Sequence, residues 1–124
     1  MEQNNILLSE KYLSLIKSDF VSFTEIAKMK NIMGVYIAYS ENENILYIGS
    51  TNKFNIRFGT DLKHESTHTL MKKILRHNLF PDRMQAKDYL VTICKFKIEK
   101  CSTKREAEAL EHFAIWVLNP TFNK

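Results

Sequence analysis

The sequence predicts an α+β domain with a small, mostly antiparallel three-stranded sheet flanked by helices. Apolar residues recur at helical spacing near both ends of the chain, and three β-rich runs lie between them. The runs are GVYIAY at 34–39, NILYIG at 44–49 and YLVTICKFKI at 89–98. The resulting order of helix, strand, strand, helix, helix, strand, helix is typical of this fold class.

The first 30 residues predict a helical N-terminal extension. A second short helix is expected at 23–29, because Ser22 and Glu25 have the spacing of a capping box. We therefore divide the chain into an extension at residues 1–30 and a main domain at 31–124. The apolar residues at helical spacing in the first helix are Leu8, Tyr12, Leu15 and Ile16.

The same signals predict the remaining elements of the main domain. The last helix starts with Thr103 and Glu106 at capping-box spacing and runs to about Leu118. Pro120 prevents its continuation. Between the second and third strands we expect a short helix within 50–63, a helix at 67–79 and a loop at 81–89.

Composition limits the class of protein. The 124 residues are enough for one domain, and the net charge of +4 allows a nucleic-acid partner without requiring one. Two cysteines do not make a disulfide framework, and the acidic, polar N-terminus is not a secretion signal. No apolar run approaches the ~20 residues of a membrane span. We expect a soluble cytoplasmic protein that does not bind membranes.

The hairpin at 34–49 carries two tyrosines at related positions. If residues 40–43 form a four-residue loop, Tyr36 lies directly opposite Tyr47. Opposed residues project from the same face of a sheet, so the two hydroxyls would emerge side by side. The pair has two interpretations, an aromatic contact within the core or a pair placed for chemistry.

Glu111 interrupts an apolar stripe of the last helix. A carboxylate at such a position is costly unless it is paired or bound to a metal. A buried salt bridge, with Arg57 as a candidate partner, and a metal site both explain it. Its neighbours on the same face are Ala107, Ala114, Ile115 and Leu118.

Taken together, these residues resemble the GIY-YIG nuclease signature. GVY and YIG carry Tyr36 and Tyr47, and Arg57 follows Tyr47 at the position where the family has its arginine. The C-terminal stretch EAEALEHFAIWVLNPTFN is similar to the last helix and tail of the family, in which a metal-binding glutamate precedes an asparagine. Here these residues are Glu111 and Asn123, and the resemblance extends from about residue 34 to 123.

The resemblance implies hydrolysis of DNA phosphodiester bonds with Mg²⁺ or Mn²⁺. Glu111 would hold the cation, which prefers oxygen ligands and would polarise the scissile phosphate. Arg57 would bind phosphate oxygens in the transition state, and Tyr36 or Tyr47 would position or deprotonate the attacking water. Asn123 would orient the site by hydrogen bonds to a tyrosine hydroxyl or a water.

Asp61 and Ser50 depart from the family pattern, whereas His68 and Gly49 agree with it. Asp61 stands where many members have a histidine or tyrosine, so His64 or His68 is a candidate for that proton-transfer role. His68 resembles a histidine of some homing endonucleases, and we include it in the catalytic set. Ser50 replaces a lysine of repair-type members and could hydrogen-bond a phosphate. Gly49 would let backbone or substrate approach closely.

Basic residues suggest where a nucleic acid would bind, although such runs are often solvated helix faces. The candidate nucleic-acid contacts are Ser50, Lys53, His64, Lys72, Lys73 and Arg76. A second basic cluster, around the last strand, either contacts DNA or protects a sheet edge. The members of this second cluster are Lys95, Lys97, Lys100, Lys104 and Arg105.

The function that we expect is therefore a metal-dependent endonuclease acting on duplex or branched DNA. Its sequence specificity would be low, or would come from the structure of the substrate, a protein partner or a homo-oligomer. The alternatives are a non-catalytic module that binds nucleic acid or protein on the same fold, and an RNA nuclease.

Overall fold

The computed structural model describes residues 2–29, 32–51 and 83–123. In these ranges the chain forms α1 (Glu2–Lys17), α2 (Phe23–Ala27), β1 (Gly34–Tyr39), β2 (Ile45–Thr51), α5 (Arg83–Thr92), β3 (Lys95–Lys100), α6 (Lys104–Leu118) and the 3₁₀ turn η2 (Thr121–Asn123). The helix expected at 67–79 falls on residues outside the described ranges. So does the helix expected within 50–63, except that residues 50 and 51 form the end of β2.

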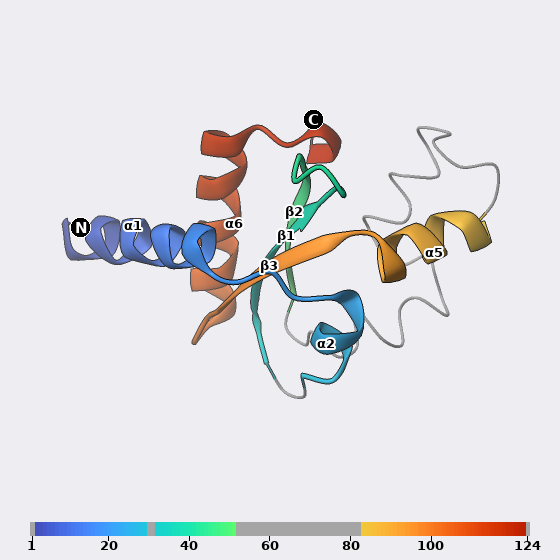
Figure 1. The fold of residues 1–124 in the computed structure, drawn as a ribbon. Helices are drawn as coiled ribbons and strands as arrows, with labels where there is room; N and C mark the ends of the chain where they lie inside the picture. The colour runs from blue at the N-terminus through green and yellow to red at the C-terminus, as the bar shows by residue number, and fades with distance from the viewer. Residues whose placement is uncertain (1, 30–31, 52–82, 124) are drawn as a thin grey trace.

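The three strands form one antiparallel sheet in the order β2-β1-β3, as predicted. All six residues of β1 are buried, because strands flank it and helices cover both of its faces (Figure 1). On one face α2 and α5 pack against Tyr36, Tyr47 and Phe96. On the other face α1 and α6 pack against Val35 and Ile48. The molecule therefore has a sheet between two helical layers.

The register of the β1–β2 hairpin differs from the prediction. The strands are connected by residues 40–44, and a bulge between Ala38 and Tyr39 shifts the pairing. As a result Tyr36 lies opposite Gly49, and Tyr47 lies opposite Ala38. The predicted direct opposition of the tyrosines is wrong, but their common face is confirmed. The longer loop and the bulge together shift the register by two residues, and a two-residue shift returns side chains to the same face.

Residues 81–89, predicted as a loop, overlap α5, and the third strand starts at Lys95 rather than at Tyr89. Ala86 and Leu90, one helical turn apart, are both fully buried in the core that contains α2. The apolar residues that follow Tyr89 have high β-propensity, but burial of this stripe selects the helix. Local propensity therefore gave the wrong element here.

The predicted starts of α2 and α6 and the end of α6 are confirmed, whereas α2 ends at Ala27, two residues before the predicted end. Ser22 Oγ accepts a hydrogen bond from the Glu25 backbone N–H, and the Glu25 carboxylate accepts one from the Ser22 N–H. Thr103 Oγ1 accepts from the Glu106 N–H at 3.1 Å. α6 ends at Asn119, whose φ of 48° is left-handed, before Pro120.

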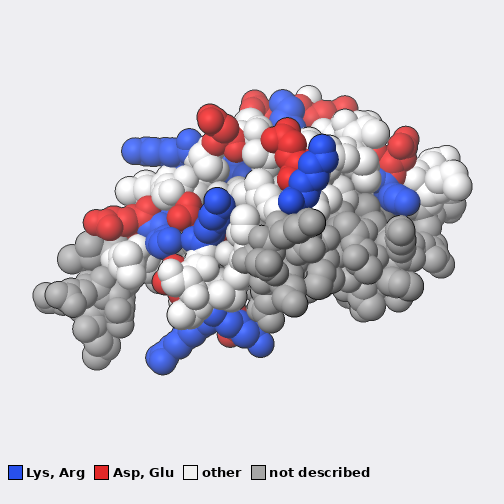
Figure 2. Space-filling view, turned by 90° about the horizontal axis from the view of Figure 1, so that it is seen from below, with Lys and Arg blue, Asp and Glu red and all other residues white. Residues whose placement is uncertain are grey.

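The basic cluster around β3 is largely engaged in contacts within the fold. The ammonium groups of Lys95 and Lys97 lie 5.3 and 4.8 Å from the centre of the Phe20 ring, and Lys97 Nζ donates to the Ile16 carbonyl. Figure 2, seen from below, shows acidic and basic side chains interspersed over the described surface of that face. Since β3 is an edge strand, these contacts favour edge protection over a continuous DNA-binding patch.

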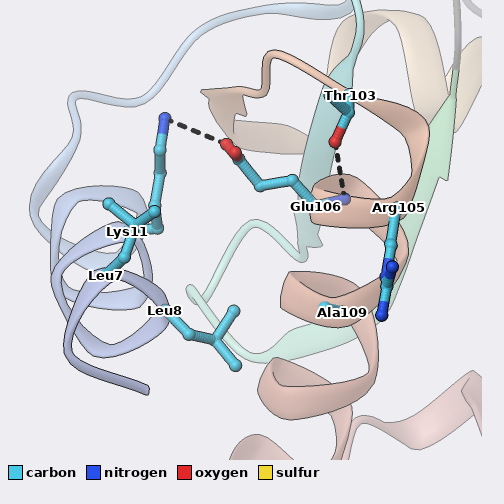
Figure 3. Close-up of a pocket in the computed structure, with 7 residues that line it drawn as sticks. All are labelled: Leu7, Leu8, Lys11, Thr103, Arg105, Glu106 and Ala109. Carbon is cyan, nitrogen blue, oxygen red and sulfur yellow. Dashed lines mark hydrogen bonds and ion pairs between the residues drawn. The ribbon is translucent and has the colours of Figure 1, made fainter. Parts of the chain in front are cut away.

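A charged network fastens α1 to β3 and to the start of α6. Lys11 Nζ lies 3.4 Å from Glu106 Oε1, an ion pair that Figure 3 shows. Lys11 Nζ also lies 3.4 Å from Glu99 Oε2, and Ser14 Oγ donates to Glu99 Oε1 at 2.6 Å. Beside this network, α1 and α6 border a hollow of about 500 Å³. None of the described candidate catalytic residues lines it. The boundary at residues 30 and 31 stays a prediction, although α1 and α2 both pack on the sheet.

Candidate active site

Tyr36 and Tyr47 lie as diagonal neighbours on the face covered by α2 and α5. Their ring centres are 6.1 Å apart, and the ring planes meet at 47°. Only 1% of Tyr36 and 7% of Tyr47 is exposed. Both rings are thus part of the core. Tyr47 belongs to the edge strand β2, and Tyr36 lies opposite Gly49 of that strand.

Gly49 is the residue over which the two tyrosines meet. A Cβ atom at this position would lie 2.6 Å from the Tyr36 hydroxyl oxygen and 2.9 Å from Tyr47 Cε2. Any side chain would therefore displace a buried ring. We expected backbone or substrate to approach Gly49 closely, whereas in the structure the groups that approach it are the side chains of Tyr36 and Tyr47.

Glu111 lies in the middle of the apolar stripe of α6, as predicted. Ala107 and Ala114 on this stripe are buried, and Glu111 itself is half-buried. Glu111 Oε1 accepts a hydrogen bond of 2.5 Å from Ser50 Oγ. The hydroxyl that was expected to contact a phosphate therefore contacts the candidate metal ligand.

Asn123 binds the outer edge of β2. Its Oδ1 accepts from the Ile48 N–H at 2.8 Å, and its Nδ2 donates to the Ile48 carbonyl at 2.9 Å. We expected the amide to hold a tyrosine hydroxyl or a water. In the structure it holds the backbone of the strand that carries Tyr47.

Three consecutive residues of β2 thus contact three of the candidate residues. Ile48 contacts Asn123, Gly49 contacts Tyr36, and Ser50 contacts Glu111. Alternate residues of a strand point to opposite faces, so Tyr36 and Glu111 approach β2 from opposite sides. Residues far apart in the sequence converge on one short segment of the edge strand.

Comparison with known proteins identifies the family. A protein-family model described as the GIY-YIG catalytic domain matches residues 32–124 of the chain. The chain belongs to the GIY-YIG family. It is a GIY-YIG-type endonuclease, as the motif predicted. No curated protein matches the chain.

A solved structure supports the same fold for this GIY-YIG domain. It is the crystal structure of the GIY-YIG N-terminal endonuclease domain of UvrC from Thermotoga maritima, a point mutant bound to its catalytic divalent cation. The match has a TM-score of 0.55 and 18% sequence identity, and covers 82% of this chain and 92% of that one. At this identity the likeness establishes the three-stranded antiparallel fold.

Several predicted site residues of this GIY-YIG domain lie outside the described ranges. They include the expected phosphate clamp and both candidate histidines, so their placement and the Arg57–Glu111 pairing stay predictions. The residues concerned are Lys53, Arg57, His64, His68, Lys72, Lys73 and Arg76.

The donor set at Glu111 is small. Among the described residues, no group of three or more His, Cys, Asp and Glu could hold a metal. One carboxylate and one hydroxyl, both hard oxygen donors, meet at this position. Sequence analysis did not identify Ile48 as part of the site, because it takes part through its backbone. Its only signal was its position between Tyr47 and Gly49.

Proposed function

We propose that this GIY-YIG domain is a metal-dependent endonuclease that hydrolyses DNA. The observation that carries the proposal is the convergence of Asn123, Tyr36 and Glu111 on residues 48–50, within a chain of this family. A binding module without activity is disfavoured because the chain keeps the motif residues Tyr36, Tyr47, Arg57, Glu111 and Asn123 together. Among the described residues, no helix is long and apolar enough to cross a membrane. The proposed place of action is the cytoplasm.

The residues at the site fit Mg²⁺ or Mn²⁺. Mg²⁺ retains several waters in proteins and is usually held by one or two carboxylates together with substrate phosphates. Glu111 supplies one carboxylate, which accepts a hydrogen bond from Ser50. When bound, the cation would neutralise charge on the scissile phosphate and stabilise the leaving oxygen.

The other residues position the reactants. The oxygen of a water attacks phosphorus, the bond from phosphorus to the leaving oxygen breaks, and a base takes the proton of the water. Tyr36 or Tyr47 would position this water or accept its proton, with His64 and His68 as alternative bases. Arg57 would bind the phosphate oxygens as charge develops. Asn123 holds the backbone of β2, the strand that carries Tyr47.

The substrate is proposed to be duplex or branched DNA, recognised with low sequence specificity. The modest net charge of +4 suits non-specific, salt-dependent backbone binding. Selection of a site would then come from the structure of the substrate, from a protein partner or from a second copy of the chain.

The test is cleavage of labelled duplex, branched and single-stranded DNA and of RNA of matched sequence, with Mg²⁺, Mn²⁺ or EDTA. We expect cleavage of duplex or branched DNA that requires the cation. Glu111→Gln should lose about 10²-fold or more in single-turnover rate. Glu108→Gln, an exposed change on the same helix, should cleave like the parent. Cleavage in EDTA, or of RNA alone, would overturn the proposal.

A further inference from the structure

We propose that Ser50 is a positioning residue that fixes Glu111 for metal binding, an inference that rests on the proposed function. The Ser50 hydroxyl and Glu111 are 61 positions apart in the chain, yet Oγ and Oε1 are separated by 2.5 Å. Hydrogen bonds between a hydroxyl and a carboxylate belong to the stronger class of hydrogen bond.

Both ends of this bond are held by rigid parts of the fold. Ser50 lies in β2 opposite Val35, and Asn123 clamps the same strand two residues earlier. Glu111 lies on α6, which is anchored by the buried residues Ala107, Leu110 and Ala114. The positions of donor and acceptor are therefore set by packing, and small movements of the side chains cannot easily break the contact.

The bond leaves acceptor capacity on the Glu111 carboxylate. Oε1 accepts one hydrogen bond from Ser50, and the remaining lone pairs of the two oxygens are those with which Glu111 would hold the cation. A glutamate side chain loses rotamer freedom when it is immobilised, and a hydrogen bond that fixes it beforehand lowers the cost of binding. Groups that orient a metal ligand typically contribute about 10–100-fold to affinity or activity.

This role differs from a direct phosphate contact. A serine that binds a phosphate would strengthen DNA binding whether or not a cation is present. A serine that orients Glu111 would strengthen cation binding even without DNA. The two roles therefore separate in measurements of each ligand alone.

The experiment is a titration of Mg²⁺ into the ¹⁵N-labelled full chain without DNA, followed by amide NMR shifts near residues 50 and 111, which detect millimolar affinities. DNA affinity in EDTA is measured in parallel. Ser50→Ala should weaken Mg²⁺ binding about 10-fold and leave DNA affinity in EDTA unchanged. Ser50→Thr, which keeps the hydroxyl, should restore most of the Mg²⁺ affinity.

Ser14→Ala is the matched control. It removes another short serine–glutamate hydrogen bond, of 2.6 Å to Glu99, where α1 meets β3. Its Mg²⁺ affinity should equal that of the parent. An equal loss in Ser14→Ala would attribute the effect to general destabilisation and overturn the inference.

Glu111→Gln separates this inference from the proposed function. If Mg²⁺ shifts no amide signals near residue 111 of the parent, the metal site itself is wrong. The same conclusion follows if Glu111→Gln binds Mg²⁺ as tightly as the parent. If Glu111→Gln loses Mg²⁺ binding but Ser50→Ala binds like the parent, only the positioning role fails. Weaker DNA binding of Ser50→Ala in EDTA, with unchanged Mg²⁺ affinity, would assign Ser50 to a phosphate.

Discussion

Asn123, the second-last residue, bonds both backbone groups of Ile48 with its side-chain amide, at 2.8 Å to the N–H and 2.9 Å to the carbonyl. Ile48 lies in the edge strand β2, so the amide takes the place that a neighbouring strand would occupy. The tail of the chain thereby closes the edge beside Gly49 and Ser50. Its effect on activity would pass through the backbone of β2.

Replacing Asn123 should therefore affect stability as well as cleavage. Asn123→Ala leaves the N–H and carbonyl of Ile48 without their partner, at a cost of about 1–3 kcal/mol in the free energy of unfolding. Cleavage should fall because β2 also carries the residues that contact Tyr36 and Glu111. Urea unfolding and single-turnover cleavage measure the two effects.

The form of the amide matters in this interpretation. Asn123→Asp keeps the acceptor but cannot donate to the Ile48 carbonyl, so it should be no better than Asn123→Ala. Thr121→Ala, an exposed change in the same 3₁₀ turn, is the control and should behave like the parent. A large loss of cleavage in Asn123→Ala with unchanged stability would point to a direct role of the amide in the reaction.

Gly49→Ala should distort the tyrosine pair. The new Cβ would lie 2.6 Å from the Tyr36 hydroxyl oxygen, and Tyr36 is too deeply buried to move away freely. Overpacking of this kind costs about 1–3 kcal/mol. The penalty should fall only in part in a Tyr36→Phe background, because that variant lacks the oxygen but keeps ring atom Cζ, which lies 2.7 Å from the new Cβ. A double-mutant cycle measures the difference. An equal penalty in both backgrounds would exclude the hydroxyl contact as its cause.

The sequence predicted those features that depend on periodicity. The common face of Tyr36 and Tyr47 follows from strand alternation and survives an error of two residues in register. The position of Glu111 in an apolar stripe follows from helical spacing. The exact pairing of the strands could not be predicted in the same way. It depends on a bulge and on Glu43, which has a left-handed φ of 64° without being glycine.

Features that depend on tertiary contacts were not accessible from the sequence. The first half of α5 consists of good helix formers, but its last residues have high β-propensity, and they join the helix because Ala86 and Leu90 are buried on one helical face. The Asn123–Ile48 contact uses backbone groups, which every residue type has. The Ser50–Glu111 bond joins distant segments, and either residue alone has several possible partners.

Lys11→Met should loosen the attachment of α1. The change removes the cation that contacts both Glu99 and Glu106, whose side chains are mostly buried, so we expect a loss of about 1–3 kcal/mol in unfolding free energy. Lys104→Met removes an exposed ion pair of 3.8 Å with Glu108 and should cost about 0.5 kcal/mol or less. Urea unfolding of both variants measures the contrast.

Lys11 should stay charged throughout the neutral range, so this contrast should hold there. Burial acts to lower the pKa of Lys11, but attraction to Glu106 and Glu99 outweighs it and raises the pKa above the usual 10.5. A raised pKa gives stability that is complete below the unfolded value and is lost as pH rises through the folded value. Equal costs for Lys11→Met and Lys104→Met at pH 7 would contradict the proposed anchoring of α1.

The two cysteines should resist alkylation in the folded protein. Burial raises the pKa of Cys94 from 9.0 to about 12, although a hydrogen bond with Tyr89 acts in the opposite direction. Burial, and after it repulsion from Glu106, raises the pKa of Cys101 from 9.0 to about 11. The thiolate is the reactive form, so both thiols should react with iodoacetamide far more slowly at pH 8 than in the unfolded chain. Mass spectrometry of peptides follows each site separately.

The same shifts predict the direction of alkaline unfolding. Below about pH 9 both thiols are protonated in the folded and unfolded chain, and their contribution to stability is complete. As pH rises towards 11 and 12 the unfolded chain loses these protons first, so the melting temperature should fall. Cys101→Ser should reduce this fall, because Ser does not titrate in that range, while leaving Cys94 in place. In the parent, Cys101 should be alkylated before the more deeply buried Cys94, and the reverse order would contradict the burial of Cys94 beneath α5.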